Sequence, residues 1–238
     1  MYDQELIVAM RAVREACRVC QRVQRILVKS DTLVKGDKSP VTVADFASQA
    51  LICKQLGEHF SLDPVVGEEG SADLQAEGAE ELREAVRVVV SQALGTEVLE
   101  RAVMSWIDRG AYDPAGEEEP PKGATPGRYW TLDPIDGTKG FLRKEHYAVA
   151  LALIEKGEVV AGVLGCPKMK VGRRQGALFT AADDENFEDD MKFADLHDGA
   201  TTADLLWDAA NSLQSSILTC LGFNDVGEFV GREELGLE

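Results

Sequence analysis

Residues 130–143 read WTLDPIDGTKGFLR and hold two aspartates, Asp133 and Asp136, three positions apart around a proline. Asp, Pro and Gly all favour turns, so this stretch alone is typical of a solvated turn. A turn that proline restricts can also aim both carboxylates and the carbonyl of Ile135 at one point. The Gly-Thr that follows offers backbone N–H groups and a hydroxyl to an anion. The pattern leaves two interpretations open, an ordinary turn and a cation site that holds an anion.

The segments on either side of this turn alternate between extended and helical patterns. RYWTLDPID is predicted to be a strand that ends in the turn, and residues 148–166 form a hairpin of two β-rich runs. Alternate residues of the hairpin are nearly all apolar, which predicts a central place in a mostly antiparallel sheet. The remaining predictions are helices at 4–28, 44–60, 78–95, 97–108 and 205–223, a turn at 35–45, a short strand within 63–71 and an exposed loop at 112–127.

Charge and composition exclude several classes of protein. The 238 residues include 25 basic and 42 acidic side chains, for a net charge of −17. Such a surface repels nucleic acid, and it also repels a phosphate ester unless a bound cation inverts the local field. No apolar run approaches the roughly 18 residues of a membrane helix, and the start lacks the basic segment of a signal peptide. We therefore expect a cytoplasmic protein with no nucleic-acid or membrane partner, whose five cysteines are reduced.

Acidic residues stand near glycine or proline at three places in the sequence. Mg²⁺ prefers oxygen ligands, commonly a few carboxylates together with water and substrate phosphate. Two such ions suit phosphoryl hydrolysis, in which one activates water and the other stabilises the leaving oxygen. Each place alone is more typical of a solvated loop, so a metal site is a hypothesis at this point. The three places are Asp45, Glu68-Glu69 and the pair Asp133/Asp136.

Three short motifs narrow these alternatives: PVTVAD at 40–45, GEE at 67–69 and LDPIDGT at 132–138. In this order they resemble the signatures of the inositol monophosphatase superfamily. The longer text GRYWTLDPIDGTKGFLRKEHYAVALALIEKGEVVAGVLGCPKM, at 127–169, resembles the 3'(2'),5'-bisphosphate nucleotidase branch, the phosphatases of sulfur assimilation. The openings ELIVAMRAVREA and KGDKSPVTVADFASQALI resemble that branch as well, so the resemblance covers residues 1–169.

The resemblance implies an α/β (α+β) fold in the layered αβαβα arrangement of sugar phosphatases. Two N-terminal helices are expected to cover a mostly antiparallel sheet. Residues 1–169 are expected to form the N-terminal domain, which binds metal and phosphate. The family's second half is longer than the segment 170–238, which is short and divergent in this chain. Most of the C-terminal half of the fold is therefore expected to be missing.

The resemblance also implies roles for the matched residues. Asp45 and Thr138 correspond to the catalytic pair that orients and activates the attacking water. The N–H groups of Gly137 and Thr138 correspond to phosphate contacts. Glu69 corresponds to a position behind the metal ligands. Two or three Mg²⁺ ions are implied, with the ligands Glu68, Asp133, the carbonyl of Ile135, and Asp136.

A further metal-binding aspartate of the family lies in a motif that WDAAN at 207–211 matches in part. This makes Asp208 a possible metal ligand, although Asn211 departs from the family's pattern. The substrate implied is adenosine 3',5'-bisphosphate, with 3'-phosphoadenylyl sulfate as a second candidate, and inhibition by Li⁺ is implied as well.

Two alternatives stay open from the sequence: an inositol monophosphatase-like phosphatase, and a catalytically impaired paralogue with a binding or regulatory role. Residues 1–238 alone are expected to turn over weakly or not at all, because the groups that hold the nucleoside belong to the family's second half. The oligomeric state is left open.

Overall fold

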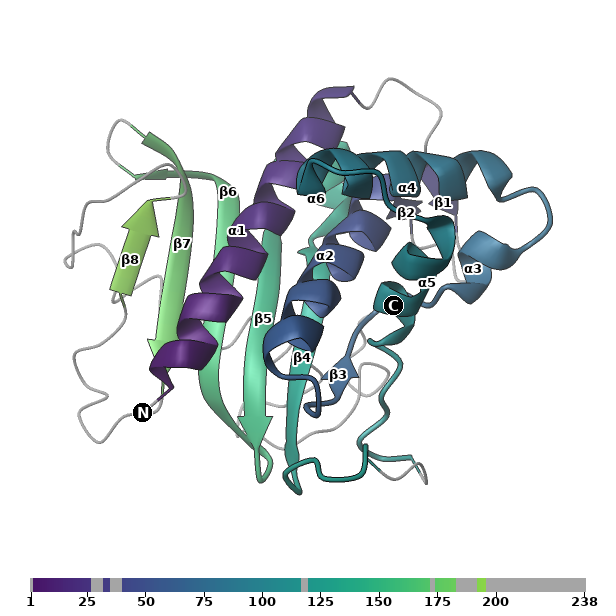
Figure 1. Ribbon diagram of the computed structural model, residues 1–238. Helices are drawn as coiled ribbons and strands as arrows, with labels where there is room; N and C mark the ends of the chain where they lie inside the picture. The colour runs from purple at the N-terminus through teal and green to yellow at the C-terminus, as the bar shows by residue number, and fades with distance from the viewer. Residues whose placement is uncertain are drawn as a thin grey trace.

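Six strands among the described residues form one sheet, hydrogen-bonded in the order β3-β4-β5-β6-β7-β8 (Figure 1). The computed structural model describes residues 2–26, 32–34, 40–116, 120–171, 174–182 and 192–195. Neighbouring strands are antiparallel, except that β3 and β4 are parallel. The strands are β3 (Val65–Val66), β4 (Arg128–Asp136), β5 (Ala148–Glu155), β6 (Glu158–Val171), β7 (Arg174–Ala182) and β8 (Lys192–Asp195).

The helices form two layers on one face of this sheet. The first helix packs against β5, β6 and β7, and the second packs against β4 (Figure 1). The fourth and fifth helices pack against the second helix and form the outer layer. A separate pair of short strands, β1 (Thr32–Val34) and β2 (Pro40–Thr42), precedes the second helix. The helices are α1 (Asp3–Ile26), α2 (Val43–His59), α3 (Ala72–Gln75), α4 (Glu80–Leu94), α5 (Glu100–Asp108) and α6 (Thr138–Leu142).

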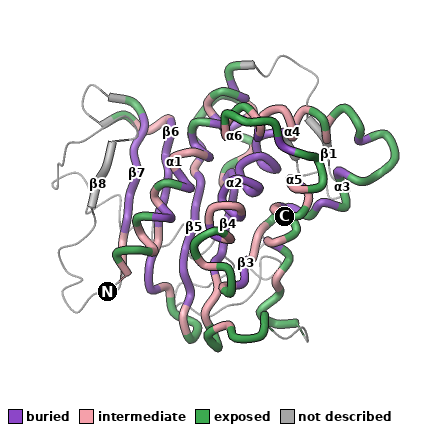
Figure 2. Tube along the Cα trace, viewed as in Figure 1, coloured by how far each residue is buried: buried purple, intermediate pink, exposed green. Residues whose placement is uncertain are grey.

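α2 is enclosed because it lies between the sheet and the outer helices. Every residue from 43 to 53 is buried, as the buried colour along the N-terminal part of this helix shows in Figure 2. A helix that is buried on all sides is expected to be apolar all round. α2 departs from this rule at three buried polar positions, Asp45, Ser48 and Gln49. Two of these positions matter for the site described below.

One arginine ties the start of β4 to three other parts of the chain. The Arg128 guanidinium donates to Asp63 Oδ2 at 2.9 Å, to Glu155 Oε1 at 2.5 Å and to Glu5 Oε1 at 3.1 Å. The indole of Trp130 donates to the same Asp63 oxygen at 3.2 Å. A guanidinium presents several donors in a rigid plane, so it can hold several acceptors at once. These bonds fix β4 next to β5 and against the N-terminus of α1.

The expected fold class is confirmed, with two N-terminal helices over a mostly antiparallel sheet and the hairpin in its centre. The turn expected at 35–45 is wrong in its second half, where Pro40–Thr42 forms β2 and Val43 begins α2. Proline is accepted as the first residue of an edge strand because no ladder bond is needed from it. The helix predicted at 205–223 lies outside the described residues.

The sequence analysis did not predict β7, because the apolar residues of this strand do not alternate with polar ones. Ala177, Leu178 and Phe179 are consecutive and all buried, so both faces of the strand are covered. β6 continues through residue 169 to Val171 and pairs with β7. The division of the chain at residue 169 stays a prediction.

Close contact between α1 and β6 depends on Gly165. A Cβ atom at this position would overlap Cys17 Sγ and lie 2.8 Å from Val13 Cγ1. We expect Gly165→Ala to lower the free energy of unfolding by about 1–3 kcal/mol, as overpacked cores do. Gly162→Ala is the matched control on the same strand, because its nearest neighbour would be a backbone oxygen 3.9 Å away. Urea unfolding of both variants measures the difference, and equal losses would contradict the close approach.

Candidate functional site

Two of the predicted acids lie toward the end of the sheet at which β3 and β4 finish. β3 pairs with β4 in parallel, with Val66 opposite Thr131. Two residues further along each strand, the chain reaches Glu68 and Asp133. Parallel neighbours have their carboxyl ends at the same edge of a sheet, where ligands commonly bind in α/β folds. Glu68 and Asp133 are therefore brought to one edge, although 64 residues separate them in the sequence.

An extra residue in β4 determines where Asp133 and Asp136 lie. Asp133 is paired with Ala150 and Asp136 with Ala148, so three steps along β4 match two steps along β5. This is a β-bulge, in which one strand carries one residue more than its partner. Ala148 and Ala150 are two residues apart and share a face of β5. Their partners Asp133 and Asp136 therefore share a face as well, which an odd spacing in a regular strand would forbid.

The face that these aspartates share is the one away from the helices. Ala150 and Ala148 pack in a small cluster with strand residues such as Leu164 and Phe179. The residues that alternate with them, Val149 and Leu151, belong to the main core with α1 and α2. Asp133 is 4% exposed and Asp136 is half-buried, so both carboxylates lie at the edge of the packed interior.

The turn after Asp136 is shaped by its own hydrogen bonds and by one glycine. Asp133 Oδ1 accepts a hydrogen bond from the backbone N–H of Ile135 at 3.1 Å. The Thr138 hydroxyl donates to the carbonyl of Ile135, also at 3.1 Å. Gly137 has φ 81° and ψ 42°, a left-handed conformation that glycine adopts at little cost, and α6 begins directly after it. The turn thus holds the Ile135 carbonyl and the Thr138 hydroxyl next to each other.

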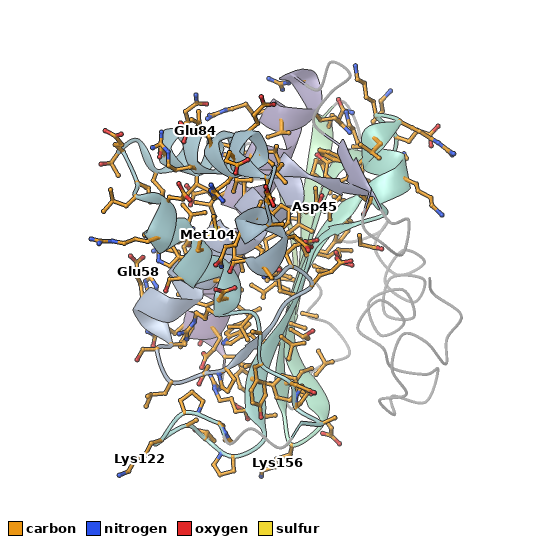
Figure 3. The ribbon with its side chains drawn as sticks, turned by 90° about the vertical axis from the view of Figure 1, so that its right-hand side faces the viewer. Asp45, Glu58, Glu84, Met104, Lys122 and Lys156 are labelled. Atoms are coloured by element: carbon orange, nitrogen blue, oxygen red, sulfur yellow. The ribbon has the colours of Figure 1, made fainter. Side chains whose placement is uncertain are left out.

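Asp45 lies in the first turn of α2, which follows β2 directly. The carboxylate is 2% exposed, and Figure 3 shows it between the helical layer and the strands. α2 packs against β4, so Asp45 lies on the element that borders the Asp133 strand. The sequence predicted that Asp45 and Thr138 act together on water. In the structure the Thr138 hydroxyl donates its hydrogen bond to the carbonyl of Ile135. The lone pairs of Thr138 Oγ1 can therefore still accept a hydrogen bond.

Buried thiols lie near these carboxylates without forming a metal site of their own. Burial raises the pKa of Cys20 to about 12, a hydrogen bond with Ser48 opposes this, and the charge of Asp45 adds to it. Burial raises the pKa of Cys166 to about 12, and the charge of Asp136 contributes. Thiolates, not thiols, bind metals, so Cys20 and Cys166 are expected to be inert at neutral pH. The expectation of packed, reduced cysteines is confirmed at the described positions.

The donor chemistry of the site fits a hard cation. The side chains and carbonyl at this edge offer oxygen only, which is the preference of Mg²⁺. Within the described residues, however, no three His, Cys, Asp or Glu side chains are arranged as a preformed metal site. The ligand set Glu68, Asp133, Ile135 and Asp136 therefore stays a prediction, as does the role of Glu69.

The sequence profile of the inositol monophosphatase family matches residues 1–191, which include the whole of this edge. The chain belongs to the inositol monophosphatase family.

Curated relatives in this family are much longer than this chain. The chain is 44% identical over 178 residues to 3'(2'),5'-bisphosphate nucleotidase 1 of Arabidopsis thaliana, with 74% of this chain and 50% of the relative covered. It is 42% identical over 171 residues to 3'(2'),5'-bisphosphate nucleotidase 1 of Candida albicans, with 71% and 47% covered. The chain thus spans about half the length of the curated relatives it matches. Among solved structures, the extragenic suppressor protein suhB of Bartonella henselae aligns with 76% of this chain and 49% of its own, at 20% identity and a TM-score of 0.47.

Some predicted features fall outside this edge or outside the described residues. Asp208 lies in the part of the chain that the structure does not describe. An open hollow beside α3 and α5 contains none of the predicted site residues. Met104, labelled in Figure 3, is one of its lining residues. The others are Gln75, Glu100, Arg101, Ser105, Asp108 and Arg109. No helix among the described residues has both the length and the apolarity needed to cross a membrane.

Sequence analysis missed one residue that contacts the site, Gln49. Its side-chain amide binds the backbone of Glu68 and Glu69 from inside α2. The signal in the sequence is a lone amide within the otherwise apolar or small stretch FASQALI, four residues after Asp45. A polar side chain in a buried helix needs hydrogen-bond partners, and this could have marked Gln49 as a contact residue.

Two glycines allow a matched test of the turn. Gly137 and Gly157 have φ values of 81° and 86°, and neither would place a Cβ in a clash. Alanine at either position is expected to cost about 1–2 kcal/mol of unfolding free energy, because an L side chain disfavours this conformation. Only Gly137→Ala is expected to weaken Mg²⁺ binding in calorimetry, since it shifts the residues that flank Asp136. Equal Mg²⁺ affinity in the two variants would contradict a role for this turn.

Proposed function

We propose that this chain carries the metal- and phosphate-binding part of a Mg²⁺-dependent phosphomonoesterase. Its substrate is adenosine 3',5'-bisphosphate, from which the 3'-phosphate (or the 2'-phosphate of the isomer) is removed, with 3'-phosphoadenylyl sulfate as a second substrate. The observation that supports the proposal is the register of the sheet, in which β3 and β4 run in parallel toward Glu68 and Asp133 and a bulge puts Asp133 and Asp136 on one face. The relatives named as 3'(2'),5'-bisphosphate nucleotidases favour this substrate over an inositol phosphate.

In this proposal each residue at the edge has a distinct task. Glu68, Asp133, Asp136 and the Ile135 carbonyl hold Mg²⁺, which when bound neutralises the phosphate and activates a water. Asp45 accepts a proton from the attacking water, and the Thr138 hydroxyl orients that water through its free lone pairs. The N–H groups of Gly137 and Thr138 donate to phosphate oxygens.

The charge of the chain is consistent with a requirement for a cation. A net charge of −17 repels a substrate with several negative charges, and the acids at the edge add to this locally. A bound divalent ion is often the largest local charge in a site and reverses the sign of the field. Substrate binding is therefore expected to depend on Mg²⁺ even where the chemical step does not limit the rate.

The remaining parts of the proposal concern the segment 170–238. We propose that Asp208 supplies a further metal ligand from this segment. In the family, the groups that hold the nucleoside belong to the second half, and they orient the phosphate against the attacking water. Loss of such positioning can lower the rate by several orders of magnitude. Residues 1–238 are therefore expected to hydrolyse the substrate slowly.

The test is phosphate release from adenosine 3',5'-bisphosphate and from inositol monophosphate, with and without Mg²⁺. Residues 1–238 and a chain extended by the C-terminal half of the Arabidopsis relative are compared. Release that requires Mg²⁺, favours the nucleotide and is faster in the extended chain is expected. Faster release from inositol monophosphate would overturn the substrate, and no release by either chain would overturn the activity.

Asp133→Asn is the variant that tests the ligand set. Amide replaces carboxylate with little change in shape, so kcat/KM is expected to fall by more than about 100-fold, since even the outer partners of metal ligands contribute about 10–100-fold. Glu158→Gln removes one charge from the exposed first residue of β6 and serves as the control. An Asp133→Asn protein as active as this control at limiting Mg²⁺ would show that Asp133 is not a ligand.

A further inference from the structure

We propose that Gln49 is a positioning residue, which fixes the backbone of Glu68 and Glu69 relative to Asp45 and thereby sets the affinity for Mg²⁺. The cation part of this inference rests on the proposed function. The positioning part rests on hydrogen bonds and packing alone.

The side-chain amide of Gln49 uses all of its hydrogen-bonding capacity on this loop and its neighbour. Oε1 accepts from the backbone N–H of Glu68 at 3.1 Å and of Glu69 at 2.8 Å. Nε2 donates to the carbonyl of Glu69 at 2.5 Å and to that of Ile107, in the last turn of α5, at 3.0 Å. A primary amide offers two acceptor and two donor positions, so none is left over.

The backbone approaches the amide closely at two glycines. A Cβ atom at Gly67 would lie 2.8 Å from the amide of Gln49, and one at Gly110 would lie 2.7 Å from its Nε2. The two glycines are themselves joined, because the N–H of Gly67 donates to the carbonyl of Gly110 at 2.7 Å. Gln49 is fully buried, so water does not compete for these bonds. The amide is therefore fixed both by its partners and by the backbone around it.

α2 links this amide to the residue proposed to activate water. Gln49 follows Asp45 by four positions, and residues four apart lie one above the other on the same face of a helix. One rigid turn of α2 thus carries the Asp45 carboxylate at one end and the anchor of the Glu68 backbone at the other. The distance between a proton acceptor and a metal ligand is set by this turn rather than by the loop.

The far end of the same loop has a separate anchor. The N–H of Ser71 donates to Asp108 Oδ1 at 2.9 Å, and its hydroxyl donates to Asp108 Oδ2 at 2.7 Å. The loop is held without Gln49 at Ser71, and at Gly67 by the carbonyl of Gly110. Loss of the amide is therefore expected to release Glu68 and Glu69 while both ends of the loop stay in place.

The experiment compares Gln49→Met with Gln55→Met in the full chain. Methionine is close to glutamine in length but makes none of the four bonds. Gln55 lies on the same helix and donates to Glu15 at 2.6 Å, so its variant tests loss of a glutamine away from the loop. Hydrogen exchange of the Glu68 and Glu69 amides is measured by NMR, and calorimetry with Mg²⁺ alone measures affinity.

Gln49→Met is expected to speed exchange at Glu68 and Glu69 by about 10-fold or more and to raise the Kd for Mg²⁺ by about 10–100-fold, the range typical of residues that orient metal ligands. The Gly67 amide is expected to stay protected, and Gln55→Met to change neither quantity. A residue that only filled the core would change overall stability without this local pattern.

Unchanged exchange at Glu68 and Glu69, or unchanged Mg²⁺ affinity, in a folded Gln49→Met protein overturns the inference. If that variant does not fold, Gly67→Ala displaces the same amide from the other side and is expected to weaken Mg²⁺ binding; an unaltered affinity there overturns the inference as well. A wild-type chain that binds Mg²⁺ but hydrolyses no phosphate ester, with both amides released in Gln49→Met, overturns the proposed function and leaves the positioning role standing.

Discussion

The single extra residue between Asp133 and Asp136 is the constraint on which the site depends. Strand side chains alternate between faces, so two acids three positions apart in a regular strand would lie on opposite sides of the sheet. The bulge places both on the face away from α1 and α2, while Ile135 between them is 1% exposed and packs into the main core. Its side chain anchors the turn, and its carbonyl stays available beside Thr138.

α2 carries buried polar residues, which lower the stability of the protein unless each has a hydrogen-bond partner. A helix buried on all sides is most stable when it is apolar, yet α2 carries Asp45, Ser48 and Gln49 in its interior. Each buried polar group must be matched by a partner, or it destabilises the protein. Gln49 is matched completely, by backbone groups from two other segments. These contacts hold a loop that has little regular structure, with β3 only two residues long.

Sequence patterns predicted most of the fold because each long element satisfies a local rule. Apolar periodicity located α1, and the alternating hairpin located β5 and β6. The bulge was not predicted, since it is defined by pairing with β5 and not by any residue within β4. β7 was missed because strands covered on both faces lose the alternation that marks them. The candidate acids came from motifs, whereas the shared edge of Glu68 and Asp133 depends on a parallel register between distant segments.

The chain is expected to tolerate a change of length between β3 and β4, but not within the paired parts of β4 and β5. Parallel neighbours require a long crossover, and here it includes α3, α4, α5 and a mostly exposed stretch within residues 112–127. Loop-closure entropy grows only logarithmically, by about 0.6 kcal/mol for each doubling of length. A reporter peptide or a whole domain inserted in that stretch would leave the sheet edge assembled. Insertion of one residue in β5 between Ala148 and Ala150 would match three steps with three, restore regular alternation and turn one of the two aspartates toward the helices.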